Sequence, residues 1–313
     1  MNKALRAIVC VSALIVVIFL AGCLFNFLDG SYLYTTQTYE ISEGFSNISI
    51  DTDTSDIAFV LSDDEVCRVS CYEKKLEKHT ARVQDGTLMI WATSEKEWYH
   101  YVGIDFGSPM ITVYLPKSEY AALVIKESTG DVDIPSGLTF DSVDITVSTG
   151  DVSCRATSLG FIKIATDTGS VCVEDARASS LAISVSTGRV SVFGVNCSDK
   201  VTVEVSTGDA VLTDVTCKSL ATSGSTGDVI LKSVIVTNGL FVERSTGDVR
   251  FDGSDASEIF VETDTGDVSG TLLSNKVFIT RTSTGTVDVP ETVDGGRCNI
   301  TTSTGDIKIE INY

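Results

Sequence analysis

The sequence predicts an all-β protein: a three-sided, right-handed parallel β-helix (a β-solenoid) of ten to eleven coils, preceded by one apolar N-terminal helix. Two observations predict this fold. A turn of the type Ser-Thr-Gly-Asp recurs every 19 or 20 residues, and apolar residues alternate with a period of two on both sides of it. A fixed repeat of this length indicates a solenoid, and a period of two indicates strands with one buried face. The right hand follows from the usual handedness of parallel crossovers.

The first residues predict an export or anchoring segment. Lys3 and Arg6 are the only charged residues before Asp29. The apolar stretch between Arg6 and Asp29 is long enough to cross a bilayer. Residues 20–23, Leu-Ala-Gly-Cys, resemble a bacterial lipobox, in which a lipid is attached to the cysteine, here Cys23. Two interpretations stay open: a lipoprotein signal peptide cleaved before Cys23, and an uncleaved membrane anchor. Both predict a chain held at the cell membrane with its repeats extracytoplasmic, because positive residues stay inside.

The apolar positions around the repeated turn predict that each coil has three sides. Apolar pairs lie seven and five residues before each glycine and two and four residues after it, and a weaker pair lies seven and nine residues after it. Three short strands per coil follow, and like positions stack about 4.8 Å apart along the axis. The glycines of the ten turns are Gly130, Gly150, Gly169, Gly188, Gly208, Gly227, Gly247, Gly266, Gly285 and Gly305.

Residues 40–120 are less regular and predict a degenerate first coil with an elaborated cap. Residues 48–59 keep the phase of the repeats, with Thr54-Ser55-Asp56 in place of Thr-Gly-Asp. The domain boundaries that follow are 1–29 for the membrane anchor or signal peptide, 30–39 for a linker, 40–120 for the first coil and cap, and 121–313 for the regular repeats, with 40–313 forming one continuous domain. The last strand has no evident cap, which predicts an exposed edge or one paired with another molecule.

The repeated Ser-Thr-Gly-Asp-Val, the N-terminal anchor and the opening Asn-Ile-Ser-Ile of residues 47–50 resemble the bacterial putative-adhesin family of β-strand-repeat proteins, a domain of unknown function. The resemblance covers about residues 40–313. It implies a β-helix and a surface-binding role, and it brings no catalytic residues.

An aspartate follows the glycine in seven of the ten turns, so stacked coils predict a column of carboxylates. Two interpretations stay open. The first is turn chemistry, in which aspartate side chains accept hydrogen bonds from corner amides. The second is a cation column that binds Ca²⁺, since that ion takes several carboxylate oxygens. The candidate column consists of Asp209, Asp228, Asp248 and Asp267. No other cofactor is expected.

The nine cysteines predict core packing rather than a disulfide scaffold or a metal site. Metal ligation is disfavoured because no Cys-x-x-Cys pair occurs and the chain has only two histidines. By phase, the expected buried cysteines are Cys154, Cys197, Cys217 and Cys298, and Cys172 is expected to face outward. Cys67 and Cys71 lie too far apart along one strand to pair with each other.

An aromatic cluster inside the irregular region is the first candidate for ligand contact. It consists of Trp98, Tyr99 and Tyr101. Aromatic rows stack on sugars and anchor interfaces, but the same residues could plug the open end of the solenoid. His79, flanked by Lys78 and Thr80, is expected to be solvated.

Charge and motifs together favour a non-enzymatic protein. A net charge of −20 excludes a general nucleic-acid binder, which needs clustered Lys and Arg. The sequence predicts a membrane-anchored surface-binding module, an adhesin whose partner is a glycan or an envelope protein. Two alternatives stay open: an envelope-stress or regulatory partner of a membrane protein, and a polysaccharide-active β-helix enzyme. The enzyme is disfavoured because coils of 19 or 20 residues leave no room for the long loops that build such active sites.

Overall fold

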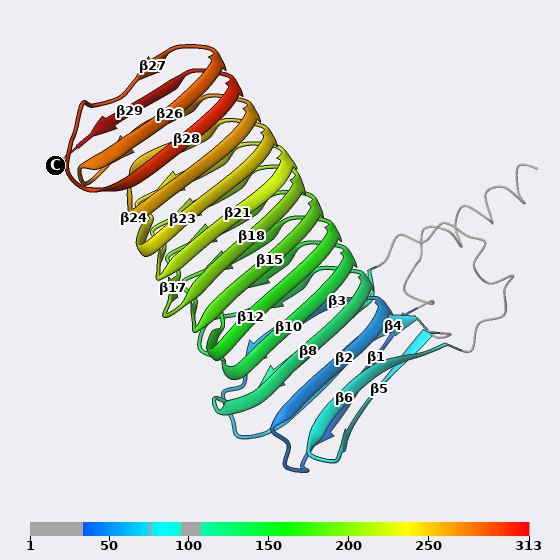
Figure 1. The fold of residues 1–313 in the computed structure, drawn as a ribbon. Coiled ribbons are helices and arrows are strands. Elements are labelled where there is room, and N and C mark those ends of the chain that lie inside the picture. The colour runs from blue at the N-terminus through cyan, green and yellow to red at the C-terminus, as the bar shows by residue number, and fades with distance from the viewer. Residues whose placement is uncertain (1–33, 75–76, 95–107, 313) are drawn as a thin grey trace, which may run out of the picture.

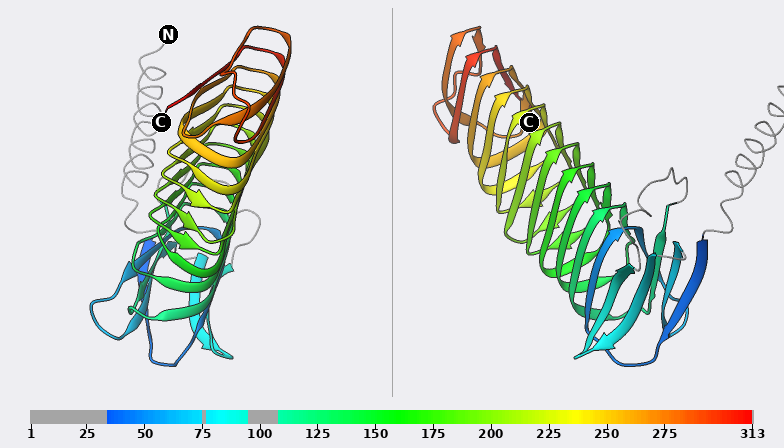
Figure 2. Two further views of the ribbon diagram at one scale, coloured as in Figure 1. Left: turned by 60° about the vertical axis from the view of Figure 1, so that its left-hand side comes forward. Right: turned by 90° about the vertical axis from the view of Figure 1, so that its right-hand side faces the viewer.

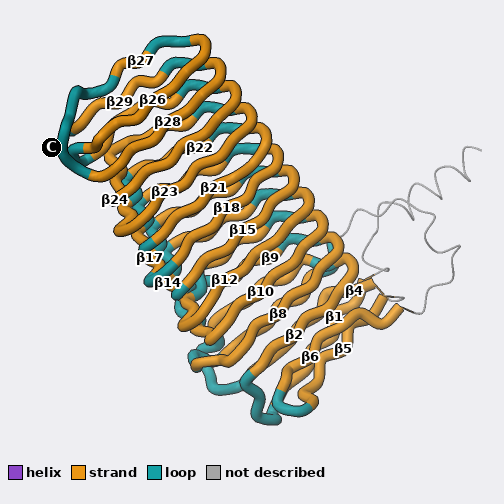
Figure 3. Tube along the Cα trace, in the orientation of Figure 1, coloured by secondary structure: helices purple, strands orange, loops and turns teal. Residues whose placement is uncertain are grey.

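The apolar residues on either side of each Thr-Gly-Asp turn line the inside of a β-solenoid, and the coils stack into a rod (Figure 1). The computed structural model describes residues 34–74, 77–94 and 108–312. In these residues every regular element is a strand (Figure 3), and no helix that could cross a membrane occurs among them. The predicted all-β solenoid is confirmed. The anchor segment, the linker up to residue 33 and Cys23 lie outside the described residues.

The longest strands form one side of the rod, which we call the long side. Its neighbouring strands pair in parallel from the N-terminal cap to the far end of the rod. In spatial order they are β6 (Thr87–Ser94), β2 (Asn47–Thr54), β8 (Glu119–Thr129), β10 (Thr139–Thr149), β12 (Thr157–Thr168), β15 (Ser180–Thr187), β18 (Lys200–Thr207), β21 (Ser219–Thr226), β23 (Ile235–Thr246), β24 (Val249–Thr265), β28 (Gly296–Thr304) and β26 (Lys276–Thr284).

The strands after each turn form the second side, and the weakest apolar pair forms the third. The second side contains β7 (Met110–Leu115), β3 (Asp56–Leu61), β9 (Val132–Ile134), β11 (Val152–Cys154), β13 (Val171–Glu174), β16 (Val190–Phe193), β19 (Ala210–Thr213), β22 (Val229–Lys232), the start of β24, β25 (Val268–Leu272), β29 (Ile307–Ile311) and β27 (Val287–Asp288). The third side contains β14 (Arg177–Ala178), β17 (Asn196–Cys197) and β20 (Thr216–Cys217), continued by the first residues of β23.

The core is a set of ladders in which like residues stack. Ile145 pairs with Ile164 and Ile164 with Ile183, and all three side chains are buried. β-branched residues suit such positions because they pack well on a pleated surface. Burying each side chain of this size contributes about 1.5 to 3 kcal/mol.

Close stacking at the corners explains the repeated glycine. At Gly188 the backbone has φ 151°, and a Cβ there would lie 1.9 Å from the carbonyl oxygen of Gly169 in the preceding coil. No side chain fits in that space, so the corner accepts only glycine. Ser55 takes the glycine position in the coil next to the cap.

The coil nearest each chain terminus does not lie at the end of the rod. At the C-terminal end β28 lies between β24 and β26, and β29 lies between β25 and β27. The last coil in the sequence is therefore inserted one place inward, and the coil of Gly285 forms the end (Figure 2). The prediction that the last strand forms an open or intermolecular edge is wrong for its first two residues, since Ile307 and Lys308 pair with both β25 and β27; residues 309–311 pair with β25 alone.

The N-terminal end has the same arrangement. β2 lies between β6 and β8, and β3 lies between β7 and β9, so residues 48–59 form the predicted extra coil. Beyond β6 and β7 the chain adds antiparallel strands, β1 (Tyr34–Ile41), β4 (Cys67–Lys74) and β5 (Glu77–Gln84). β5 pairs with β6, and β4 pairs with both β7 and β1, so these strands close the open end of the solenoid. We call β1, β4 and β5 the cap.

Candidate functional site

The predicted aspartate column exists, and its carboxylates form a ladder of hydrogen bonds. The backbone amide of Asp228 donates to Oδ1 of Asp209 at 3.1 Å, Asp248 donates to Asp228 at 2.9 Å, and Asp267 donates to Asp248 at 2.8 Å. The ladder continues to the inserted last coil, where the amide of Asp306 donates to Asp267 at 2.7 Å. Each carboxylate thus holds the corner of the next coil, which is the geometry of the turn interpretation. The cation interpretation stays a prediction.

An arginine interrupts the row of aspartates in the coil before Asp209 and forms an ion pair with that residue. Arg189 replaces the aspartate in its coil, and its Nη2 lies 2.8 Å from Oδ2 of Asp209. The guanidinium therefore takes the place of a further carboxylate next to the column. Trp98, Tyr99 and Tyr101, the predicted aromatic contacts, lie outside the described residues.

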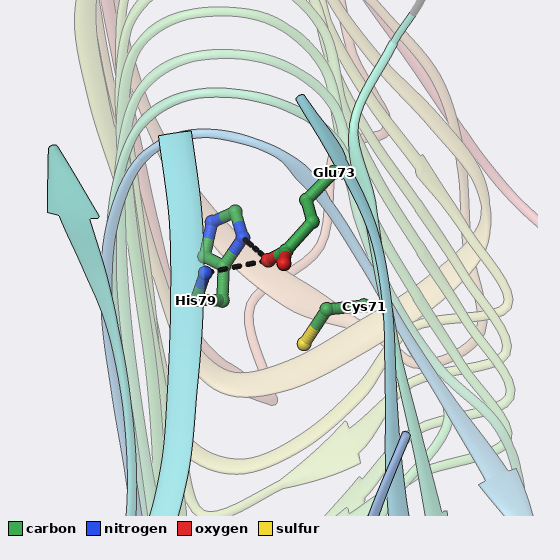
Figure 4. Close-up of side chains that lie close together, drawn as sticks. All are labelled: Cys71, Glu73 and His79. Atoms are coloured by element: carbon green, nitrogen blue, oxygen red, sulfur yellow. Dashed lines mark hydrogen bonds and ion pairs between the residues drawn. The ribbon is translucent and has the colours of Figure 1, made fainter. Parts of the chain in front are cut away.

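A cluster of polar side chains lies buried inside the N-terminal cap (Figure 4). Cys71 and Glu73 are two residues apart on β4 and face inward together, and His79 faces them from β5. Glu73 is 2% exposed and His79 3% exposed. Nδ1 of His79 lies 3.1 Å from Oε2 of Glu73, and the backbone amide of His79 donates to the same oxygen at 2.5 Å. The prediction that His79 is solvated is wrong, because β5 turns it into the space that the cap encloses.

The cluster extends into the first coil through Ser55. Its Oγ lies 3.1 Å from Nε2 of His79 and donates to the carbonyl oxygen of Thr54 at 2.7 Å. Serine, histidine and glutamate thus follow one another as in a catalytic triad. However, Ser55 is 1% exposed and its proton points to Thr54, away from the imidazole. The arrangement therefore presents no nucleophile to a substrate.

Sequence reasoning missed this cluster, although the pattern of β4 contains a signal for it. Cys67, Val69, Cys71 and Glu73 alternate in one phase and all are buried. A glutamate in phase with a core row indicates a buried carboxylate that needs a partner. His79 is in phase with buried Ala81 in the same way.

A second buried carboxylate lies in the next coil. Oγ1 of Thr52 donates to Oε2 of Glu127, and the amide of Thr129 donates to Oε1 at 3.2 Å. Burial raises the pKa of Glu127 to about 7, and these hydrogen bonds oppose the rise. Glu127 occupies an inward row that holds valine and threonine in the following coils.

The cysteines of the described residues are free thiols. Cys154, Cys197, Cys217 and Cys298 are buried, as their phase predicts, and Cys172 is half-buried. Burial raises the pKa of the Cys67 thiol to about 12, and burial together with Glu73 does the same for Cys71. These thiols are protonated and apolar in the cap as it stands.

The long side carries an uncovered aromatic pair. Phe241 of β23 and Phe260 of β24 occupy equivalent positions in adjacent coils, and their rings stack at 5.0 Å with 3° between the planes. Phe241 is 47% exposed, and its ring lies over Gly239, where a Cβ would come within 2.6 Å of it. On the other side of Phe241, the strand β21 carries small residues at the facing positions, Ala221 and Ser223.

The step from phenylalanine to alanine leaves a shallow depression of about 420 Å³ on this side. Its polar rim consists of Lys200, Thr202, Glu204, Ser223, Glu243, Glu262, Asn299 and Thr301. The rim contains more carboxylates than cations. One aromatic face and several hydrogen-bonding groups therefore converge on one open surface.

These features define a class: a β-solenoid with glycine corners, an acidic turn ladder and a closed N-terminal cap. The chain belongs to the Toastrack DUF4097 family, which matches residues 45–199 and 196–313. No curated protein matches the sequence.

Several solved structures are similar in fold. A "putative lipid binding protein" from Parabacteroides distasonis ATCC 8503 is 17% identical, with a TM-score of 0.47 over 88% of this chain and 97% of that chain. A "putative adhesin" from the same organism is 14% identical, with a TM-score of 0.44 over 88% and 96%. A "putative adhesin" from Bacteroides fragilis NCTC 9343 is 14% identical, with a TM-score of 0.40 over 88% and 97%.

Proposed function

We propose that this chain is a non-enzymatic binding module, held at the cell membrane by its N-terminal segment with the solenoid on the extracytoplasmic side, that binds a neutral glycan. The observation that carries the proposal is the open Phe241–Phe260 pair beside the depression over Ala221. The C–H face of a sugar ring packs on an aromatic face, and its hydroxyls hydrogen-bond to carboxylates, amides and hydroxyls around it.

The charge of the surface favours a neutral sugar over an acidic one. Glu204, Glu243 and Glu262 line the depression, and the whole chain carries a net charge of −20. Carboxylates accept hydrogen bonds from neutral hydroxyls but repel uronic or sialic acids. The rigid strands beneath also hold the aromatic faces in place without a cost in loop ordering.

The test of the binding surface compares two phenylalanines with equal exposure. Phe241 on the long side and Phe193 on the second side are each 47% exposed. Binding of the purified chain to immobilised neutral polysaccharides is measured for the wild type, Phe241→Ala and Phe193→Ala. We expect Phe241→Ala to weaken binding at least about tenfold, as for an aromatic contact worth about 1.4 kcal/mol, and Phe193→Ala to leave it unchanged.

Two results would contradict the glycan proposal. One is binding that Phe241→Ala and Phe193→Ala weaken equally. The other is binding only to an envelope protein, which would favour the regulatory alternative. Location is tested separately by adding protease to intact cells: a solenoid on the extracytoplasmic surface is accessible there, and protection until lysis would contradict surface display.

A further inference from the structure

The thiol, carboxylate and imidazole of the cap cluster converge on one point. One ligand atom from each of Cys71, Glu73 and His79 lies within 4.8 Å of the others, and this is the only such group among the described residues. We propose that these three side chains bind a divalent transition-metal ion of the Zn²⁺ type and that the ion joins β4 to β5 inside the cap. This inference is independent of the proposed glycan binding.

The donor set selects the class of ion. A thiolate, an imidazole nitrogen and a carboxylate oxygen suit Zn²⁺ and similar ions, whereas Ca²⁺ and Mg²⁺ take oxygen ligands. With metal–ligand distances of about 2.0 to 2.3 Å, ligand atoms around a tetrahedral ion lie about 3.3 to 3.8 Å apart. Nδ1 of His79 and Oε2 of Glu73 are already 3.1 Å apart. Sγ of Cys71 lies within 4.8 Å of both atoms, so a shift of at most about 1 Å brings it to this spacing.

The groups around the cluster already orient the ligands. Nε2 of His79 faces Oγ of Ser55 at 3.1 Å, which turns Nδ1 toward Glu73 and Cys71. Metal-binding histidines usually have such a partner on the second ring nitrogen. Tyr39 fixes the strand by donating to the carbonyl oxygen of His79 at 2.6 Å.

The charges balance when the ion binds. The thiol of Cys71 releases its proton to solvent when it binds the ion, because the thiolate is the form that ligates metals. A divalent ion is then surrounded by one thiolate, one carboxylate and one neutral imidazole, so two negative charges meet two positive charges. The resulting centre is neutral, as a buried site requires.

One ligand of the cluster borders the surface. His79 also lines a surface depression of about 310 Å³, together with Thr54, Thr129 and Pro109. The fourth coordination position can take a water molecule from that side, as in many zinc sites. Cys67, the other thiol of β4, lies on the same face but belongs to no ligand cluster, which makes it a matched control.

The test uses the reduced, chelator-treated full-length chain and Co²⁺ as a spectroscopic probe. We expect one Co²⁺ per chain, a cysteinate-to-cobalt charge-transfer band, and loss of that band when Zn²⁺ displaces the probe. Cys71→Ala abolishes the band and Cys67→Ala retains it. Ser55→Ala, which removes the partner of Nε2, lowers the affinity by about tenfold while keeping the band.

The wild type alone can overturn the proposal, so the outcome does not depend on whether a variant folds. Absence of a thiolate band at excess Co²⁺ would refute the site, even if some Co²⁺ binds elsewhere. A band that survives in folded Cys71→Ala, or one lost in folded Cys67→Ala, would place the ion at another cysteine and refute it as well.

Discussion

Nη1 of Arg244 donates a 2.7 Å hydrogen bond to the carbonyl oxygen of Val205, two coils away on the long side. The guanidinium reaches it through the space left by Gly224 in the coil between them. Arg244 is 2% exposed, and its Nε and Nη2 are buried without a hydrogen-bond partner among the described residues. Burial accordingly lowers the pKa of Arg244, which Asp209 and Asp228 oppose.

The first prediction is that Arg244→Met stabilises the solenoid. Methionine fills a similar volume and removes a desolvated cation with two unpaired groups, at the loss of one hydrogen bond. We expect the free energy of unfolding to rise by about 1 to 2 kcal/mol in urea titrations. Arg250→Met, at an exposed site on the second side of the same coil, serves as the control and changes stability by less than about 0.5 kcal/mol. A clear loss of stability in Arg244→Met would show that the single bond to Val205 outweighs the unpaired groups.

The second prediction concerns the glycine beneath that guanidinium. A Cβ at Gly224 would lie 1.8 Å from the carbonyl oxygen of Val205 and 2.0 Å from Nη1 of Arg244. Gly224→Ala should therefore destabilise the fold by about 2 to 3 kcal/mol, and adding Arg244→Met should recover part of the loss by removing one of the two clashes. Gly44→Ala, where a Cβ meets nothing within 4 Å, is the matched control. If the changes in unfolding free energy of Gly224→Ala and Arg244→Met simply add in the double variant, the two side chains do not compete for the same space, and the prediction is contradicted.

The third prediction separates the two interpretations of the aspartate ladder. Asn retains the oxygen that accepts the amide of Asp248, so Asp228→Asn should keep the thermal midpoint within a few degrees, and Asp228→Ala should cost about 1 kcal/mol. Because the ladder is satisfied by corner amides, we expect the same midpoint in chelator and in millimolar Ca²⁺. A midpoint that rises with Ca²⁺ in the wild type, but not in Asp228→Asn, would instead establish the cation column.

The fourth prediction is a pH dependence that arises from Glu127. Desolvation raises its folded-state pKa to about 7, above the unfolded value of 4.5. Between these values the folded chain holds a proton that the unfolded chain has released, so this residue's contribution to stability is full below about pH 4.5 and is lost as the pH rises through 7.

The pH dependence is measured against Glu127→Gln, which cannot ionise. We expect the wild type to lose about 3 kcal/mol of unfolding free energy relative to this variant between pH 4.5 and pH 8. Parallel curves for the two proteins would show that Glu127 is not the group responsible.

The repeat alone predicts the three ladders, because residues such as Ile164 and Val171 keep one phase from coil to coil. It also predicts the glycine corners, whose cause is a steric contact repeated at each turn. The order of the terminal coils cannot be predicted in this way. Val268 pairs with Ile307 and not with Val287, yet all three occupy the same position in the repeat. Equivalent coils offer equivalent surfaces, so periodicity does not determine which coil lies next to which.

The cap cluster escaped prediction for a different reason. His79 and Glu73 are brought together by antiparallel strands that follow no repeat, so their meeting depends on how β4 and β5 fold over the open end. The phase of Glu73 indicates burial, but no spacing in the sequence indicates its partner. The aspartate ladder, by contrast, needed only the repeat, and the sequence left open only what its carboxylates bind.

Because β2 and β28, in the coils nearest the two chain ends, are each paired on both sides, neither coil can be peeled off as an end coil could be. A force applied at the N-terminus reaches β1 first, which pairs with β4, and then β2, which must shear against both β6 and β8 before its coil is released. At the other end, β28 is held between β24 and β26 in the same way. The coils nearest the two chain ends therefore act as latches that resist mechanical unravelling.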